Sequence, residues 1–237
     1  MNIKTALVTG ASKGIGEAIS ALLVERGIEV YGIGRDFTKT APSLIKDPLF
    51  HGVTCDLTND KETEVCVNFI RKQASIDMLV NNAGCAYYGL HEQLKADGIR
   101  EMIKTNLELP IVLTGRFLPD FKKRGGLIIN ISSVTGSSFA NPHGAAYGAT
   151  KAGLLSFGRS IFEEARKCGV MVTSIMPDMT RTELYRNADF EADSEEGTGL
   201  DPIDVARMVG VVLDLPDGVT LPEITIRPQK HRIRKKQ

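Results

Sequence analysis

Two hydrophobic periods alternate within the first 34 residues, and this alternation constrains the fold more than any other feature of the sequence. Residues 3–8 are a short apolar run of the kind that forms a buried strand. From Gly14 onward, apolar residues recur at the three- and four-residue spacing of one helix face, and Gly27 ends this pattern. Residues 28–33 are a second apolar strand. The segment therefore predicts a β-α-β unit, whose two strands run parallel in one sheet.

The same alternation continues to the other end of the chain. Further strands are predicted at residues 50–55, 78–81, 127–131, 170–175 and 224–226, and helices at residues 60–73, 97–118, 147–167 and 202–215. Pro110 predicts a kink inside the second of these helices. Apolar strands separated by helices indicate a doubly wound α/β fold, in which helices cover both faces of a parallel sheet.

Residues 1–237 show no internal repeat or linker and are expected to form a single domain. Within it, the polar stretch 186–199 is rich in Asp, Glu and Gly and predicts a substrate loop or lid. Residues 229–237 form a basic tail. Two interpretations of this tail stay open: a solvated chain end, or an arm that docks phosphate or RNA.

Composition excludes several classes of function. Lysine plus arginine and aspartate plus glutamate number 29 each, so no global charge favours nucleic acid or an anionic membrane. The four cysteines form no C-x-x-C pair and have no histidine at metal-ligand spacing, so we expect reduced, mostly buried thiols and no metal site. No signal peptide and no membrane-spanning apolar run is found, which favours a cytoplasmic protein without a membrane partner.

A glycine-rich loop joins the first strand to the first helix. Residues without a Cβ let the backbone turn sharply and approach a pyrophosphate, and the helix that follows offers N–H groups and a positive dipole end to the anion. A tight turn without a ligand is the alternative interpretation. The candidate cofactor-binding residues of this loop are Gly10, Ser12, Lys13, Gly14, Ile15 and Gly16.

The end of the second strand bears on the choice of cofactor. Gly34 stands where an enzyme that uses NAD usually carries a carboxylate for the ribose 2′-hydroxyl. Arg35 follows it, and Lys13 adds a second cation from the glycine loop; both suit a 2′-phosphate. The sequence therefore predicts NADP(H). Asp36 argues against this because it can bind a ribose hydroxyl, and Arg35 is alternatively a solvated loop cation.

Tyr147 and Lys151 stand four residues apart at the start of a predicted helix and therefore share one of its faces. A nearby ammonium favours a phenolate, so Lys151 together with the positive charge of an oxidised nicotinamide is predicted to lower the pKa of Tyr147 toward neutrality for proton transfer. Ser133 follows the strand of residues 127–131 and is expected at the same site, while Ser132 points the other way. The alternatives are a tyrosine packed on a lysine stem and a serine that only forms a turn.

Taken together, these motifs resemble the short-chain dehydrogenase/reductase family, in the same order over residues 3–182. The family pattern is carried by Thr9-Gly10-x-x-x-Gly14-x-Gly16, Asn81-Asn82-Ala83-Gly84, Asn106, Ser132-Ser133 and Tyr147-x-x-x-Lys151. The resemblance implies a Rossmann-type sheet of seven strands in the order 3-2-1-4-5-6-7. It also implies an NADP(H)-dependent oxidoreductase that transfers hydride between nicotinamide and a carbonyl compound or secondary alcohol.

The resemblance also assigns roles to individual residues. Tyr147 is expected to be the general acid–base, and Ser133 to position the substrate oxygen. Lys151 is expected to lower the pKa of the tyrosine and bind the nicotinamide ribose, and Asn106 to hold a relay water. The remaining cofactor contacts are Asp56 and Leu57 at the adenine, Asn82, Ala83 and Gly84 at the ribose, and Pro177 and Thr180 near the carboxamide.

Two positions depart from the family pattern. Asp178 follows Pro177 where the family commonly has glycine, and the interval from Ser133 to Tyr147 is one residue longer than usual. Residues expected near the substrate are Phe139, His143, Tyr87, Tyr88, Leu184 and Tyr185. Relatives form dimers or tetramers, so a homodimer or homotetramer is expected through the helices that begin near residues 97 and 147. A non-catalytic NADP(H) sensor is the alternative function, although every catalytic position is filled.

Overall fold

A computed structural model describes residues 3–137 and 140–236, which excludes the predicted substrate neighbour Phe139. Seven parallel strands form one sheet in the order β3-β2-β1-β4-β5-β6-β8, as the family resemblance implies. Their bounds are β1 Thr5–Thr9, β2 Glu29–Gly34, β3 Phe50–Thr54, β4 Met78–Asn81, β5 Gly126–Ile131, β6 Val170–Pro177 and β8 Glu223–Ile226. The predicted doubly wound α/β fold is therefore confirmed.

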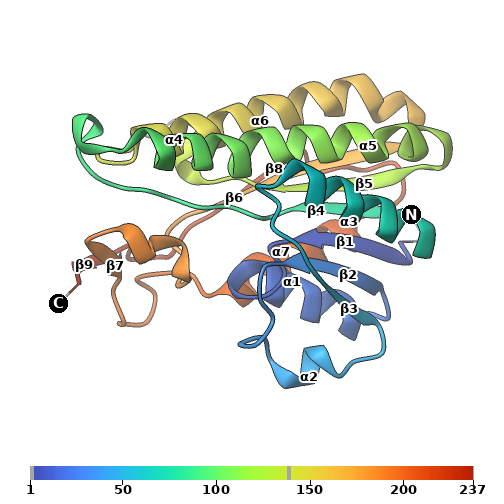
Figure 1. Cartoon of the computed structure of the whole chain (residues 1–237), viewed down its shortest axis with the longest axis horizontal. Helices are drawn as coiled ribbons and strands as arrows, with labels where there is room; N and C mark the ends of the chain where they lie inside the picture. Colours follow the sequence, from blue (N-terminus) through green and yellow to red (C-terminus); the bar gives the residue numbers. More distant parts are fainter. Residues whose placement is uncertain (1–2, 138–139, 237) are drawn as a thin grey trace.

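Helices cover both faces of the sheet (Figure 1). One face carries α1 and α7, and the other carries α3, the α4–α5 pair and α6. Successive side chains of a strand point to opposite faces of the sheet. Ala6 and Val8 therefore pack in the core on the α1 and α7 face, while Leu7 between them packs in the core on the other face. The helix bounds are α1 Gly14–Glu25, α2 Pro42–Ile45, α3 Asp60–Gln73, α4 Ala96–Ile103, α5 Leu109–Arg124, α6 Ala145–Ala165 and α7 Pro202–Leu213.

The predicted kink near Pro110 is a short π-helical turn, Lys104–Glu108, that separates α4 from α5. Proline has no N–H, so Pro110 cannot donate the usual i→i−4 bond to the carbonyl of Asn106. The N–H of Leu109 instead bonds the carbonyl of Lys104, one residue further back than in an α-helix. This turn buries Asn106, a predicted site residue, beneath the end of the sheet.

A second, antiparallel sheet lies outside the main one and was not predicted. It pairs β7 (Phe190–Ala192) with β9 (Ile233–Lys235), close to the C-terminus in Figure 1. The basic tail is solvent-exposed, in keeping with the interpretation as a solvated chain end, but its residues Ile233–Lys235 form strand β9. No helix within the described residues is both long and apolar enough to span a membrane.

Candidate active site

The glycine loop is packed so tightly that a side chain at Gly10 or Gly16 would collide with its neighbours or strain the backbone. Gly10 has a φ of 67°, in the left-handed region that glycine tolerates. A Cβ on Gly16 would lie 2.1 Å from the carbonyl oxygen of Gly10 and 2.5 Å from the amide nitrogen of Asn82. The loop turns directly into α1, whose first N–H groups have no partner within the helix. This cradle fits a dinucleotide pyrophosphate, as the sequence predicts.

The segment Asn82–Gly84 locks onto this loop through Thr9. The Thr9 hydroxyl accepts hydrogen bonds of 3.0 Å from the backbone N–H of Asn82 and of Ala83. The side-chain amide of Asn82 donates to the carbonyls of Thr9 (2.8 Å) and Gly10 (3.2 Å). The two segments predicted to hold opposite parts of the cofactor therefore form one rigid unit at the ends of β1 and β4.

At the end of β2, packing explains the missing carboxylate. A Cβ on Gly34 would lie 2.8 Å from the Cβ of Ser12, so this position has no room for a side chain. Asp36 uses both carboxylate oxygens to accept bonds from the N–H (2.8 Å) and hydroxyl (3.0 Å) of Thr38. These bonds hold the pKa of Asp36 below its usual value, and the charges of Lys39 and Lys13 act in the same direction. Lys39 is a cation at this site that sequence reasoning missed.

The predicted adenine contacts follow β3. Asp56 accepts hydrogen bonds from the N–H (2.9 Å) and the hydroxyl (2.8 Å) of Thr58, which hold its pKa below the usual value; the charge of Arg35 adds to this. Leu57 is buried beside it. Arg35 is exposed and shares this edge of the sheet with Asp56. The residues predicted for the adenosine end of the cofactor therefore meet around the ends of β2 and β3.

Tyr147 is nearly inaccessible, with 3% of its surface exposed. Burial raises the pKa of Tyr147 above its usual value, and a hydrogen bond with Ser133 offsets only part of this. The Ser133 hydroxyl also accepts from the N–H (3.2 Å) and the hydroxyl (3.0 Å) of Thr135. Ser133 and Tyr147 therefore lie together, as the sequence predicts. Packing of the chain itself therefore opposes the predicted lowering, because burial outweighs the hydrogen bond; a lowering by Lys151 together with an oxidised nicotinamide stays a prediction.

Lys151 lies on the same helix face as Tyr147 and is 4% exposed. Its Nζ donates to the carbonyl of Ile131 at 2.8 Å and stands 5.9 Å from the centroid of the Tyr147 ring. The hydrogen bond of the ammonium goes to this carbonyl, and burial lowers the pKa of Lys151 to about 8. Ser132 donates to the carbonyl of Lys151 at 2.9 Å, and its orientation opposite to Ser133 stays a prediction.

Asn106 connects the catalytic helix to the cofactor side of the site. Its amide donates to the carbonyl of Cys85 (2.9 Å) and the hydroxyl of Thr150 (3.1 Å), and its oxygen accepts from the N–H of Cys85 (2.9 Å). A Cβ on Gly84 would lie 3.7 Å from the Nζ of Lys151. The predicted ribose segment and the predicted catalytic lysine are therefore neighbours. Cys85 and Thr150, which the sequence did not single out, fix the amide of Asn106.

The strand end that departs from the family pattern carries a buried carboxylate that pairs with an exposed arginine. The side chain of Asp178 is 6% exposed and accepts a bond from Nε of Arg227 at 2.7 Å. Nδ1 of His231 lies 3.3 Å from its other carboxylate oxygen. Thr180 is also buried, and its hydroxyl donates to the carbonyl of Asp178 at 2.9 Å. Asp178 thus contacts the C-terminal segment of the chain.

A lid, which we define as residues 183–199, follows this strand. Tyr185 and Phe190 of the lid surround Tyr88, with ring centroids 5.9 and 5.0 Å away. Tyr88 in turn lies 5.8 Å from the ring of Tyr147. The base of the lid reaches the glycine loop, where Glu183 pairs with Lys13 at 2.5 Å. Lys13 therefore has a carboxylate partner, and Phe190 and Glu183 are contacts that sequence reasoning missed.

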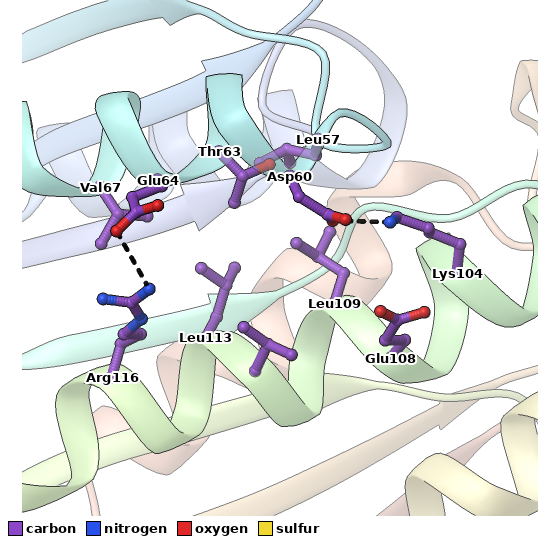
Figure 2. Close-up of a pocket in the computed structure, with 11 residues that line it drawn as sticks. Leu57, Asp60, Thr63, Glu64, Val67, Lys104, Glu108, Leu109, Leu113 and Arg116 are labelled. Carbon is purple, nitrogen blue, oxygen red and sulfur yellow. Dashed lines mark hydrogen bonds and ion pairs between the residues drawn. The ribbon is translucent and has the colours of Figure 1, made fainter.

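A hollow between α3 and α5 lies apart from these residues. Ion pairs border it: Lys104 with Asp60 at 2.6 Å, and Arg116 with Glu64 at 3.7 Å (Figure 2). Of the predicted site residues that the structure describes, Leu57 lines it, whereas Tyr147, Ser133 and Lys151 do not. Within residues 3–137 and 140–236, no group of His, Cys, Asp and Glu is arranged to hold a metal.

Comparison with known proteins gives one family. The family model described as short chain dehydrogenase matches residues 4–192. A 3-oxoacyl-(acyl-carrier-protein) reductase of Vibrio cholerae is 36% identical over 188 residues, which cover 77% of this chain and 76% of the relative. An alcohol dehydrogenase of Thermococcus sibiricus, solved with 5-hydroxy-NADP, is 26% identical with a TM-score of 0.86, covering 98% and 99% of the two chains. A 4-hydroxyisoleucine dehydrogenase solved with NADH is 25% identical with a TM-score of 0.82, covering 96% and 98%.

Proposed function

The chain belongs to the short-chain dehydrogenase family and is an oxidoreductase of that family, and on this premise we propose its reaction and cofactor. It transfers hydride between NADP(H) and a carbonyl compound or secondary alcohol, with Tyr147 as general acid–base. The observation that carries this proposal is the arrangement of three groups. The hydroxyl of Ser133 bonds Tyr147, and Lys151 lies one helical turn along and beside Gly84 of the cofactor segment.

Ser133 and Tyr147 act on the substrate oxygen. Because their side chains interact, the two hydroxyls would hold a carbonyl oxygen together, and the phenol would deliver its proton as the oxygen gains charge. When bound, the cofactor supplies or accepts the hydride at its nicotinamide, and its oxidised form carries a positive charge. Tyr147 needs such stabilisation because burial raises its pKa. The covering lid keeps water away from this proton transfer.

Lys151 and Asn106 support the proton path. An ammonium has three donors, and Lys151 spends one on the carbonyl of Ile131, which leaves two for a ribose hydroxyl and a relay water. Asn106 fixes the loop at Cys85 and the helix at Thr150. In an α-helix, the N–H of residue 110 would bond the main-chain carbonyl of Asn106, but Pro110 has no N–H. This carbonyl is therefore suited to hold that water. Lys151 and Asn106 therefore position groups and pass protons.

The choice of NADP(H) rests on charge and space around β2. Gly34 has no room for a carboxylate, and Asp36 is engaged with Thr38. Lys13 and Lys39 are close enough to act on the charge of Asp36, and Arg35 on that of Asp56, which supplies cations for a 2′-phosphate. Solved relatives bind either form of the cofactor, so this local arrangement carries the preference. An oxidoreductase with these cations favours the phosphorylated cofactor through charge-assisted bonds.

The substrate class and assembly follow from the same proposal. Relatives act on 3-oxoacyl groups, alcohols and hydroxy amino acids, as their names state. The aromatic rings over Tyr147 favour a carbonyl compound with apolar substituents. A homodimer or homotetramer is expected to use the helical face of α4, α5 and α6, which lie side by side in Figure 1 and expose Ile103 and Ile111. Light scattering that gives a monomer would exclude such an assembly.

Cofactor oxidation measured across a substrate panel tests the function. NADPH and NADH are offered with ketones, aldehydes, 3-oxoacyl thioesters and quinones to the wild type and to Tyr147→Phe. We expect NADPH-dependent turnover that falls on the order of 100- to 10,000-fold in the variant, while NADPH binding is retained. Tyr31→Phe, which alters a buried tyrosine in β2, is the matched control and keeps its activity. Near-full activity of Tyr147→Phe would overturn the mechanism, and a preference for NADH would overturn the cofactor assignment.

A further inference from the structure

Two sequence features have no role in the reaction as described: Asp178 in place of glycine, and the basic tail. The structure brings them together. We propose that residues 230–236, which we call the strap, fasten the lid over Tyr147 and so position the substrate; this rests on the proposed function. The strap is then a positioning segment of the active site. Its cations pair with acidic residues of the chain's own lid and do not bind nucleic acid.

Asp178 anchors the start of the strap. It lies at the end of β6, buried, and holds Arg227 through Nε and His231 through Nδ1. The backbone at His231 has a φ of 41°, a conformation that residues with a side chain rarely adopt. The contact with Asp178 offsets that strain at the point where the chain turns toward the lid. A glycine at position 178 would provide no carboxylate for this anchor.

The strap then runs between two parts of the lid, residues 197–198 and residues 190–193. On one side, the backbone N–H of Lys230 donates to the carbonyl of Gly197 (2.9 Å), and the backbone N–H of Arg232 donates to the carbonyl of Thr198 (3.0 Å). On the other side β9 pairs with β7, and the N–H of Asp193 bonds the carbonyl of Arg232 at 3.1 Å. Removing the strap would therefore leave backbone groups on both parts of the lid without these partners.

Charges on the strap and the lid are complementary. Lys230 and Arg232 both bond Glu195, each at 2.7 Å, and Arg234 bonds Glu191 at 2.9 Å. Three cations of the basic tail thus have acidic partners within the predicted lid. These pairs are exposed, so each one contributes little alone, and their joint effect depends on the backbone pairing that aligns them.

A short chain of contacts connects the strap to the catalytic tyrosine. Phe190 stands in β7 directly opposite Lys235, and its ring packs edge-on against Tyr88 at 5.0 Å. Tyr88 contacts the ring of Tyr147 at 5.8 Å. The strap also reaches the aromatic cluster from the other end, where Nζ of Lys236 bonds the carbonyl of Tyr185. Movement of the strap therefore changes which rings cover Tyr147.

The cover over Tyr147 must open for a substrate to arrive and close for the reaction, because 3% of this residue is exposed. The strap sets how readily the lid opens and where its rings stand once it is closed. Its loss is expected to weaken the retention of substrate and to misplace the substrate oxygen. Cofactor binding is expected to change little, because the glycine loop is built from separate elements.

One truncation and two substituted full-length variants test the strap. The first ends at Gln229, and the second, Arg234→Glu, opposes Glu191 with a like charge. The third adds Glu191→Lys to Arg234→Glu and restores the pair with the charges exchanged. Arg26→Glu breaks an exposed pair of the same kind, with Asp214, between α1 and α7 and is the matched control. Hydrogen exchange of the amides in residues 190–193, NADPH binding by fluorescence, and KM and kcat for the best substrate of the panel are measured.

We expect truncation to raise exchange at residues 190–193 and to lower kcat/KM at least roughly tenfold, mainly through KM, with NADPH affinity changed less than about twofold. Arg234→Glu is expected to act in the same direction, the exchanged pair to recover most of the loss, and Arg26→Glu to leave both readouts unchanged. Unchanged exchange after truncation, or unchanged kcat/KM with a freely exchanging lid, would overturn the proposal. If the wild type turns over no panel compound, the proposed function fails, while the exchange data still decide whether the strap holds the lid.

Discussion

The glycine-loop region and the lid border the same site and touch through Lys13 and Glu183, but different forces hold them. The glycine loop is fixed by buried strands, by glycines that permit contact at atomic distance, and by neutral bonds from Thr9 and Asn82. The lid is fixed by two three-residue strands and by exposed ion pairs with the strap. Short strand pairs are marginal in water, and exposed ion pairs are weak.

This difference separates two tasks within one domain. A rigid loop presents the same N–H groups to every cofactor molecule, which keeps the ordering required on binding small. A weakly held lid opens at a small fraction of the free energy of unfolding, so substrate exchange does not require the sheet to unfold. The first prediction compares the stability of the sheet core with that of the lid, the second concerns the buried Lys151, and the last two concern the cofactor side.

The largest effect is expected from the core beneath the sheet. Phe121 is fully buried on α5 and packs against Gly126 of β5. Phe121→Ala is expected to lower the free energy of unfolding by about 3–5 kcal/mol. Phe190→Ala removes a ring of the same size from the lid and is expected to cost less than about 1 kcal/mol, because the global transition does not depend on the lid. Urea denaturation measures both; equal losses would show that lid and sheet unfold as one unit.

Lys151 gives a pH-dependent test of the buried site. Its pKa is about 8 in the folded state, below the 10.5 of an exposed lysine. Between these values the unfolded chain binds the extra proton, so this group makes the protein more stable as pH rises. Relative to Lys151→Met, the wild type is expected to gain up to about 3 kcal/mol between about pH 7 and pH 10. Denaturation of both proteins across that range checks it, and a constant difference would mean that the ammonium is not buried.

The glycine cradle is tested with one methyl group. Gly16→Ala places a Cβ against the carbonyl of Gly10, and overpacking of this size weakens NADPH binding roughly tenfold or more. Gly115→Ala is the control, because a Cβ there meets nothing within 4 Å and alanine favours the helix. Titration of NADPH fluorescence measures both. If Gly16→Ala binds as tightly as wild type, the pyrophosphate does not lie in this loop.

The smallest effect concerns the contact that joins the two regions. Glu183 of the lid holds Lys13 of the glycine loop, and this bond keeps the pKa of Glu183 below its usual value. A 2′-phosphate would compete with Glu183 for the same ammonium. Lys13→Met is therefore expected to raise KM for NADPH several-fold and Glu183→Gln to lower it a few-fold, while KM for NADH stays unchanged in both. Steady-state kinetics with each cofactor decides; shifts in the same direction would contradict the competition.

Local periodicity was sufficient to predict the central fold. The helix Asp60–Gln73 and the strand Met78–Asn81 have the predicted bounds, and the kink lies beside Pro110 as expected. Each is set by residues within one or two turns of chain, so the sequence carries the signal directly. The convergence of Ser133 with Tyr147 was predicted because the ends of parallel strands meet at one edge of the sheet.

By itself, then, the sequence determined the β-α-β framework, the glycine cradle and the helix face shared by Tyr147 and Lys151. Tertiary structure alone decided the direction of the pKa of Tyr147, because burial is a property of everything packed around it. It also brought together residues that lie far apart in the chain: Arg227 meets Asp178 from 49 positions away, and Lys13 meets Glu183 from 170. Three-residue strands are too short to show a period, and ion pairs between distant residues leave no local pattern, so these contacts emerge only once the sheet has folded.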